Sequence, residues 1–191
     1  MIYNFMDIDI KKSTETLINE GVILYPTDTV WGLGCDATNV TAVSKIFEIK
    51  KRNESKSLII LVNSVEMLQK YTTETPNFVL NFLKTIQNPT TIIYSNPKNL
   101  AKNVISSENT VAIRLIQDEF CQKLIKNFGK PIVSTSANIS GEPAPQIFSD
   151  VSSYIIENCD YVVEHRQNDT EKRNPSRLVR FDSEGNIEFL R

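Results

Sequence analysis

The most informative segment of the chain runs from Tyr25 to Val62, and it opens with the residues Tyr25-Pro26-Thr27-Asp28-Thr29-Val30-Trp31-Gly32-Leu33-Gly34. It closes with Lys50-Lys51-Arg52, Lys56 and the apolar run Leu58 to Val62. Apolar runs bounded by turn residues predict buried strands, and the residues between them follow helical spacing. We therefore expect this segment to form, in order, a strand, a polar loop, a helix, a cationic cluster and a second strand. Two hydroxyls and a carboxylate in the loop, with three adjacent cations after the helix, suit a small zwitterion beside a polyphosphate.

The length and composition indicate one ordinary globular domain. At 191 residues the chain can bury a full core, and we expect a single domain over residues 1–191. The formal charge of −2 gives no overall attraction to nucleic acid. Basic residues concentrate in residues 45–56 and 166–180, however. If the fold brings these segments together, they form one basic concave cleft.

The three cysteines, Cys35, Cys121 and Cys159, are odd in number and lack the spacing of metal ligands. Reduced thiols in a cytoplasmic protein fit this pattern best. No apolar run reaches the ~18 residues of a membrane span, so we expect no membrane association. Residues 1–10 lack the basic start of a signal peptide.

Further along the chain, strands and helices are expected to alternate. Residues 1–9 alternate apolar and acidic side chains, which predicts an edge strand. Further strands are expected over residues 22–25, 58–62, 90–94, 111–115, 131–135 and 161–164, and helices over residues 11–20, 38–50, 64–71, 75–86, 118–128 and 148–158. A closing hairpin at residues 178–190 would make the sheet mixed. The pattern predicts an α/β domain, and residues 166–175 read as a loop that closes over the site.

Several familiar motifs are incomplete or missing. Gly32 to Ala37 fits G-x-G-x-x-A, but the acidic residue expected about 20 residues on is absent, so the glycines are expected to serve a tight turn. There is no G-x-x-x-x-G-K-[ST] phosphate loop and no G-x-S-x-G elbow. His165 is the only histidine and is expected at the surface, which argues against triad hydrolysis and a histidine metal site.

Three other features each allow two readings. Lys50, Arg52 and Lys56 are either a solvated helix end or a fan that reaches several oxygens of one phosphate chain. The hydroxyl-rich run from Ser134 to Pro145 is either a capped turn or a ligand site at the end of a strand. Arg114 lies within an apolar strand, so it needs an anion, which is either a structural carboxylate or that of a ligand.

Taken together, these segments resemble the signatures of the YrdC-like family of threonylcarbamoyl-AMP synthases. The family's K-x-R motif is matched by Lys50 and Arg52, and its S-x-N motif by Ser136 and Asn138. The resemblance covers about residues 10–191 and is to the short form of the family. It implies a twisted open sheet with a basic concave face. It also implies that L-threonine, bicarbonate or CO2, and ATP with its Mg²⁺ become threonylcarbamoyl-adenylate and pyrophosphate.

The resemblance also assigns residues by matching position. L-threonine would contact Thr29, Leu61, Arg114, Ser134 and Ser176. ATP would contact Arg52, Lys56, Thr110, Ser136, Asn138, Ala144 and Arg191. The catalytic set would be Lys50, Arg52, Ser136 and Asn138, with Lys50 on the phosphate side and no protein side chain binding metal. The product would pass to a downstream threonylcarbamoyl transferase complex that modifies tRNA beside the anticodon, and a direct tRNA contact is left open.

The chain departs from the family pattern at several points, including Ser57, where a proline is usual, and Arg177, where the late Ser-Thr pair would end. These departures affect local contacts rather than the expected activity. The chemistry needs little covalent help, because orientation and charge neutralisation carry the rate. The competing hypothesis is a module that binds structured RNA through the same cations without catalysis. A third, a carbamoyl-transferring maturation domain, is disfavoured because fused domains and zinc-finger cysteines are missing.

Overall fold

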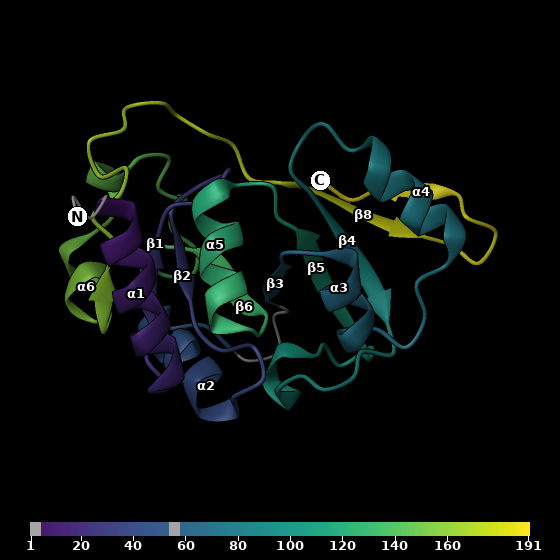
Figure 1. Ribbon diagram of the computed structural model, residues 1–191, viewed down its shortest axis with the longest axis horizontal. Helices are drawn as coiled ribbons and strands as arrows, with labels where there is room; N and C mark the ends of the chain where they lie inside the picture. The colour runs from purple at the N-terminus through teal and green to yellow at the C-terminus, as the bar shows by residue number, and fades with distance from the viewer. Residues whose placement is uncertain (1–4, 54–57) are drawn as a thin grey trace.

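The computed structural model describes residues 5–53 and 58–191 and shows one nine-stranded mixed sheet with flanking helices (Figure 1). The strand order is β7-β1-β2-β6-β3-β5-β4-β8-β9. The strands are β1 (Ile23–Tyr25), β2 (Gly32–Gly34), β3 (Ile59–Val62), β4 (Thr90–Ser95), β5 (Thr110–Leu115), β6 (Ile132–Ser136), β7 (Tyr161–Val162), β8 (Arg177–Phe181) and β9 (Ile187–Phe189). The expected α/β class is confirmed. Antiparallel pairs occur along the whole sheet, however, and not only in the closing hairpin.

The helices are α1 (Phe5–Ile18), α2 (Val40–Ile49), α3 (Val65–Tyr71), α4 (Asn77–Thr85), α5 (Glu119–Phe128) and α6 (Ser153–Glu157), with short 3-10 turns η1 (Lys102–Val104) and η2 (Phe148–Asp150). Capping residues set several of their ends. The Ser64 side chain accepts from the Met67 amide, and Asp118 accepts from Cys121. Gly129 ends α5 in the left-handed conformation, as the sequence predicted.

Three expectations about these elements were wrong. Residues 5–9 belong to α1 rather than to an edge strand, and residues 32–34 form β2 where a polar loop was expected. The helix expected over residues 148–158 is divided into η2 and α6. At the division, Asp150 accepts from the amides of Gln146 and Ile147, and Ser152 starts the second helix as its cap.

The core has two parts because successive side chains of a strand face opposite sides of the sheet. On one face, α1 and α5 lie side by side and pack with Tyr25, Leu61 and Ile132 (Figure 1). Side chains that point to the other face of the sheet, such as Ile60 and Ile113, pack in a larger cluster with α2, α3, α4 and α6. None of the described helices is long and apolar enough to cross a membrane.

Candidate active site

A cavity of about 360 Å³ lies on one face of the sheet, beyond the part that α5 covers. Strand register explains its walls, since residues paired directly across neighbouring strands point to the same side. Ile59 pairs with both Ser134 and Ala112, Ala112 with Ile93, and Gly32 with Ser136. All of these residues line the cavity. A volume of this size suits a small-molecule ligand.

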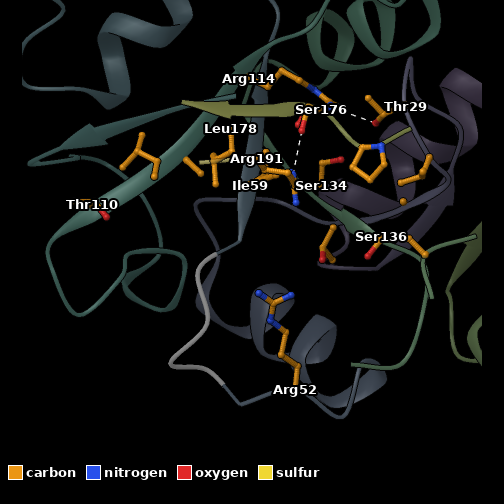
Figure 2. A pocket seen from close by; sticks show the side chains of 17 residues that line it. Thr29, Arg52, Ile59, Thr110, Arg114, Ser134, Ser136, Ser176, Leu178 and Arg191 are labelled. Carbon is orange, nitrogen blue, oxygen red and sulfur yellow. Dashed lines mark hydrogen bonds between the residues drawn. The ribbon is translucent and has the colours of Figure 1, made fainter. Parts of the chain in front are cut away.

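One side of the cavity is built around Arg114, which has 3% of its surface exposed. Its Nη1 donates to Thr29 Oγ1 at 3.1 Å (Figure 2), and its Nη2 lies 3.3 Å from the Asp28 carboxylate. Thr27 and Thr29 share a hydroxyl hydrogen bond of 2.8 Å, which fixes the loop after β1. Arg114 thus pairs with a structural carboxylate and also lines the cavity. The structural reading of this residue is confirmed, and the ligand reading stays a prediction.

The buried environment acts on Asp28 more strongly than its cation does. Burial raises the pKa of Asp28, and the nearby Arg114 offsets this only in part. The Arg114 Nε is buried without a hydrogen-bond partner among the described residues. A buried N–H of this kind costs free energy until it finds an acceptor. Arg114, which lines this side of the cavity, therefore keeps one N–H without an acceptor among the described residues.

Ser176 and Arg191 join the same wall from the end of the chain. The Ser176 hydroxyl is hydrogen bonded to Thr91 at 2.8 Å, and its carbonyl accepts from Arg191 Nε at 3.1 Å. Figure 2 shows Arg191 next to Ser176, with the hydrogen bond between them as a dashed line. Ser176 and Arg191 therefore line the same cavity as Thr29.

Arg52 projects toward the cavity from the opposite side, just beyond α2 (Figure 2). Burial lowers the pKa of its guanidinium. Lys51 has φ +47°, and the amide of Arg52 donates to Phe47 while that of Lys51 donates to Glu48. These two bonds form a Schellman motif, which normally carries glycine at the left-handed position. The motif turns the chain at the end of the helix.

The structure brings together nine of the residues named for the site, namely Thr29, Arg52, Thr110, Arg114, Ser134, Ser136, Ala144, Ser176 and Arg191. Three others do not line the cavity. Leu61 is fully buried beneath α5, and Lys50 and Asn138 contact each other outside the cavity wall. Lys56 falls outside the described residues.

The Lys50 ammonium donates to the carbonyls of Ser136 and Asn138, the second at 2.7 Å. Only 1% of the residue is exposed. Burial, reinforced by Arg52, lowers the pKa of Lys50 to about 7. Its ammonium is thus occupied by protein oxygens rather than presented to a ligand.

Sequence reasoning missed the apolar part of the wall, which includes Val30, Ile59, Ile93, Ala112, Pro175 and Leu178. The alternation of side chains along each strand could have indicated these residues. Ile59 pairs with both Ala112 and Ser134, so all three side chains point to the same face of the sheet. The described lining contains three arginines and no carboxylate. Most other cations of residues 166–180 serve ion pairs instead, Arg166 with Asp118 and Arg173 with Asp169. A wider basic cleft stays a prediction.

The three thiols were expected to be reduced, and Cys35, Cys121 and Cys159 are all free. His165 is half-buried rather than exposed, because its ring stacks on Phe120 with centroids 5.5 Å apart. Among the residues that the structure describes, no group of three or more His, Cys, Asp or Glu side chains could hold a metal ion.

Comparison with known proteins places this geometry in a family. Residues 15–191 match the family Sua5_yciO_yrdC, described as "Telomere recombination", and the chain belongs to this family. The threonylcarbamoyl-AMP synthase of Pseudoalteromonas translucida is 34% identical over 146 residues, which are 75% of this chain and 78% of the relative. That of Photobacterium profundum is 33% identical over 159 residues, 80% and 86% of the two chains.

Among solved structures, the chain is similar to P. abyssi Sua5 complexed with L-threonine, with a TM-score of 0.85 and 26% identity. The match covers 100% of this chain and 55% of the Sua5 chain. The chain therefore corresponds to little more than half of that longer protein. The expected fold relationship is confirmed.

Proposed function

We propose that the protein is an L-threonylcarbamoyladenylate synthase, which makes threonylcarbamoyl-AMP and pyrophosphate from L-threonine, bicarbonate or CO2, and ATP. The observation that carries the proposal is one cavity with a buried Arg114 on one side and Arg52 on the other. The first suits an amino-acid carboxylate and the second a phosphate chain. The relatives named threonylcarbamoyl-AMP synthase support the same activity.

Each end of the cavity has a defined role in this proposal. Thr29, Ser134 and Ser176 surround the threonine beside Arg114, while Ser136, Thr110, the Ala144 backbone and Arg191 contact the nucleotide. The threonine amine adds to CO2 with loss of a proton, or attacks bicarbonate with loss of water, to give a carbamate. A carbamate oxygen then attacks the α-phosphorus as pyrophosphate leaves. The cavity supplies orientation and positive charge for these steps. Mg²⁺ would enter with ATP, since no Asp or Glu side chain belongs to the described lining.

The product would be passed in the cytoplasm to a threonylcarbamoyl transferase complex that modifies tRNA next to the anticodon. A non-catalytic RNA-binding module is less favoured, because a recessed cavity with a buried arginine offers little to a phosphate backbone that lies across a surface. Direct contact with tRNA is not required for the reaction.

Pyrophosphate release from ATP tests the proposal directly. Release should require both L-threonine and bicarbonate, and serine or valine should replace threonine poorly. Arg52→Ala should lower the rate by roughly 10²–10³-fold, as expected when a group that stabilises transition-state charge is removed. Release without threonine, or salt-sensitive RNA binding without any turnover of ATP, would overturn the assignment.

A further inference from the structure

The K-x-R and S-x-N motifs each contribute one residue to the cavity and one residue that lies outside it. Arg52 and Ser136 line the cavity, whereas Lys50 and Asn138 do not. Residues two positions apart commonly face different ways, so the motif spacing itself permits this division. The question is what the two residues outside the cavity do.

Lys50 is attached to the segment 136–142, here called the S-x-N loop, through both its side chain and its main chain. Its ammonium donates to the carbonyls of Ser136 and Asn138 and lies 3.5 Å from Asn138 Oδ1. Its own carbonyl accepts from the Ser140 amide at 2.8 Å. The end of α2 and the loop are therefore joined by bonds that run in both directions.

Asn138 completes the attachment from within the loop. Its side-chain amide donates to the carbonyls of Ile139 at 2.9 Å and Glu142 at 2.7 Å. Both amide protons are thereby used inside the loop, and its oxygen faces Lys50. The side chain has no donor left for a ligand, because a primary amide carries two N–H groups.

Moving the Lys50 side chain out of this position would cost free energy, because its hydrogen bonds to the loop would break. An ammonium that moved to a phosphate would lose its hydrogen bonds to two partly buried carbonyls; the Ser136 carbonyl would keep the Asn138 amide as a donor, but the Asn138 carbonyl would lose the donor it now has. The neighbouring turn fixes the other side of the contact. Lys51 is left-handed and its ammonium lies 4.5 Å from the centroid of the Tyr154 ring, while Arg52 turns toward the cavity.

We propose that Lys50 and Asn138 are positioning residues that hold the S-x-N loop against the end of α2, and so set the separation of Arg52 and Ser136 across the cavity. Their contribution to catalysis rests on the proposed function. Their contribution to loop geometry does not, and it is measurable in the protein without any ligand.

The first experiment compares Lys50→Met with Lys51→Met in the ligand-free protein. Each change replaces a lysine of the same turn by an uncharged side chain of similar length, but only the first removes the amino group bonded to the loop. Amide hydrogen exchange at Ser140 should become roughly tenfold faster or more in Lys50→Met, and stay near the wild-type rate in Lys51→Met. Equal exchange at Ser140 in all three proteins would overturn the proposal.

The second experiment uses the wild-type chain, so it does not depend on a variant that folds. NMR signals of the Lys50 ammonium and the Arg52 guanidinium are followed as ATP is added. The Arg52 signal should move strongly, and the Lys50 signal should keep its hydrogen-bond couplings to the Ser136 and Asn138 carbonyls. Loss of those couplings with a shift as large as that of Arg52 would show a phosphate contact instead and overturn the proposal.

Substrate binding separates this proposal from the assignment of function. Lys50→Met should bind L-threonine within about twofold of wild type, since Arg114 lies on the other side of the cavity, while ATP binding weakens by roughly tenfold. If wild-type protein releases no pyrophosphate but the exchange result holds, the assigned activity fails and the positioning role stands. If threonine and ATP binding weaken equally, the loss is general and the positioning role fails.

Discussion

Arg114 meets one carboxylate, that of Asp28 at 3.3 Å, although it lies almost wholly inside the protein. Its remaining contact in the structure is the Thr29 hydroxyl, and its Nε is buried without a partner among the described residues. A guanidinium presents five N–H groups in a fixed plane, which is suited to a carboxylate held by two parallel hydrogen bonds. This residue is accordingly the one on which threonine binding should depend most.

We predict that Arg114→Lys weakens L-threonine binding by about 10–100-fold, because an ammonium keeps the charge but not the planar pair of donors. Isothermal titration with L-threonine measures the effect. Arg180→Lys is the matched control, since Arg180 is about half exposed and lies 3.9 Å from Glu108 on the surface. Unchanged threonine affinity in Arg114→Lys would remove this arginine from the site.

The lowered pKa of Lys50 predicts how the stability of the protein depends on pH. Its pKa is about 7 in the folded protein, against 10.5 for an ordinary lysine, because burial and Arg52 disfavour the charged form. Between these two values the unfolded chain binds a proton that the folded chain does not. The contribution of this residue to the free energy of unfolding therefore rises as pH increases from about 7 toward 10.

Urea denaturation of wild type and Lys50→Met at about pH 7 and about pH 9.5 isolates this effect, since the other lysines and tyrosines titrate in both proteins. The stability of wild type relative to the variant should increase with pH. A constant difference across this range would mean that Lys50 keeps an ordinary pKa in the folded protein.

At the scale of elements, local signals predicted most helices and central strands. Asp118 and Gly129 bound α5, and Ser64 caps α3, because these residue types satisfy helix ends through their own chemistry. The first part of the N-terminal helix was missed, because residues 6–10 alternate apolar and acidic side chains and a helix was expected only from residue 11. Asp9 is nevertheless buried, since its carboxylate accepts hydrogen bonds from Tyr161, Glu164 and His165, and these partners lie far away in the sequence.

The sequence also predicted part of the candidate site. Motif matches named most of the polar lining, but they did not show which way each side chain faces. Lys50 and Asn138 differ from Arg52 and Ser136 only through tertiary contacts. The apolar lining had no motif and follows from register alone, as Ile59 and Ala112 show.

The strand β2 was missed for a related reason, since two glycines in three residues disfavour a strand by propensity. Its glycines allow close packing rather than a tight turn. A Cβ on Gly34 would lie 2.6 Å from Tyr25 Cε1 and 3.0 Å from the Val133 carbonyl. Tyr25 is fully buried there, so its ring has little room to move.

We predict that Gly34→Ala destabilises the protein by about 1–3 kcal/mol through overpacking, as measured by urea denaturation. Gly32→Ala is the matched control in the same strand, because its new Cβ would lie no closer than 3.3 Å to the nearest atom. Gly32→Ala should lower the free energy of unfolding by clearly less than Gly34→Ala does. Equal losses in the two variants would show that backbone freedom, rather than packing against Tyr25, is what the glycines supply.

At the scale of the whole molecule, the cavity is assembled from both ends of the chain, with lining residues from Thr29 to Arg191. The segment 166–175 connects the two ends of the sheet as a long strand-free path across the molecule (Figure 1). Arg166 holds its start through the Asp118 carboxylate at 2.5 Å and the Thr27 carbonyl at 3.3 Å. Pro175, at its end, lines the cavity. Both ends of this segment are thus attached near the proposed threonine position.

A segment fixed at its ends but without helix or strand between them can close over a bound ligand at small cost. Lys172 and Arg173 offer trypsin sites within it, and the Arg173 side chain forms ion pairs with Asp169 and Glu171 of the same segment. We predict that ATP and L-threonine together slow tryptic cleavage there several-fold more than either alone, since closure needs both ends of the cavity filled. Timed digestion followed by mass spectrometry measures each cut.

Cleavage after Lys126, on the exposed face of α5, serves as the internal control. If the cuts at Lys172 and Arg173 proceed at one rate in all four conditions, the segment does not close, and the unstable adenylate must be protected by the fixed walls alone.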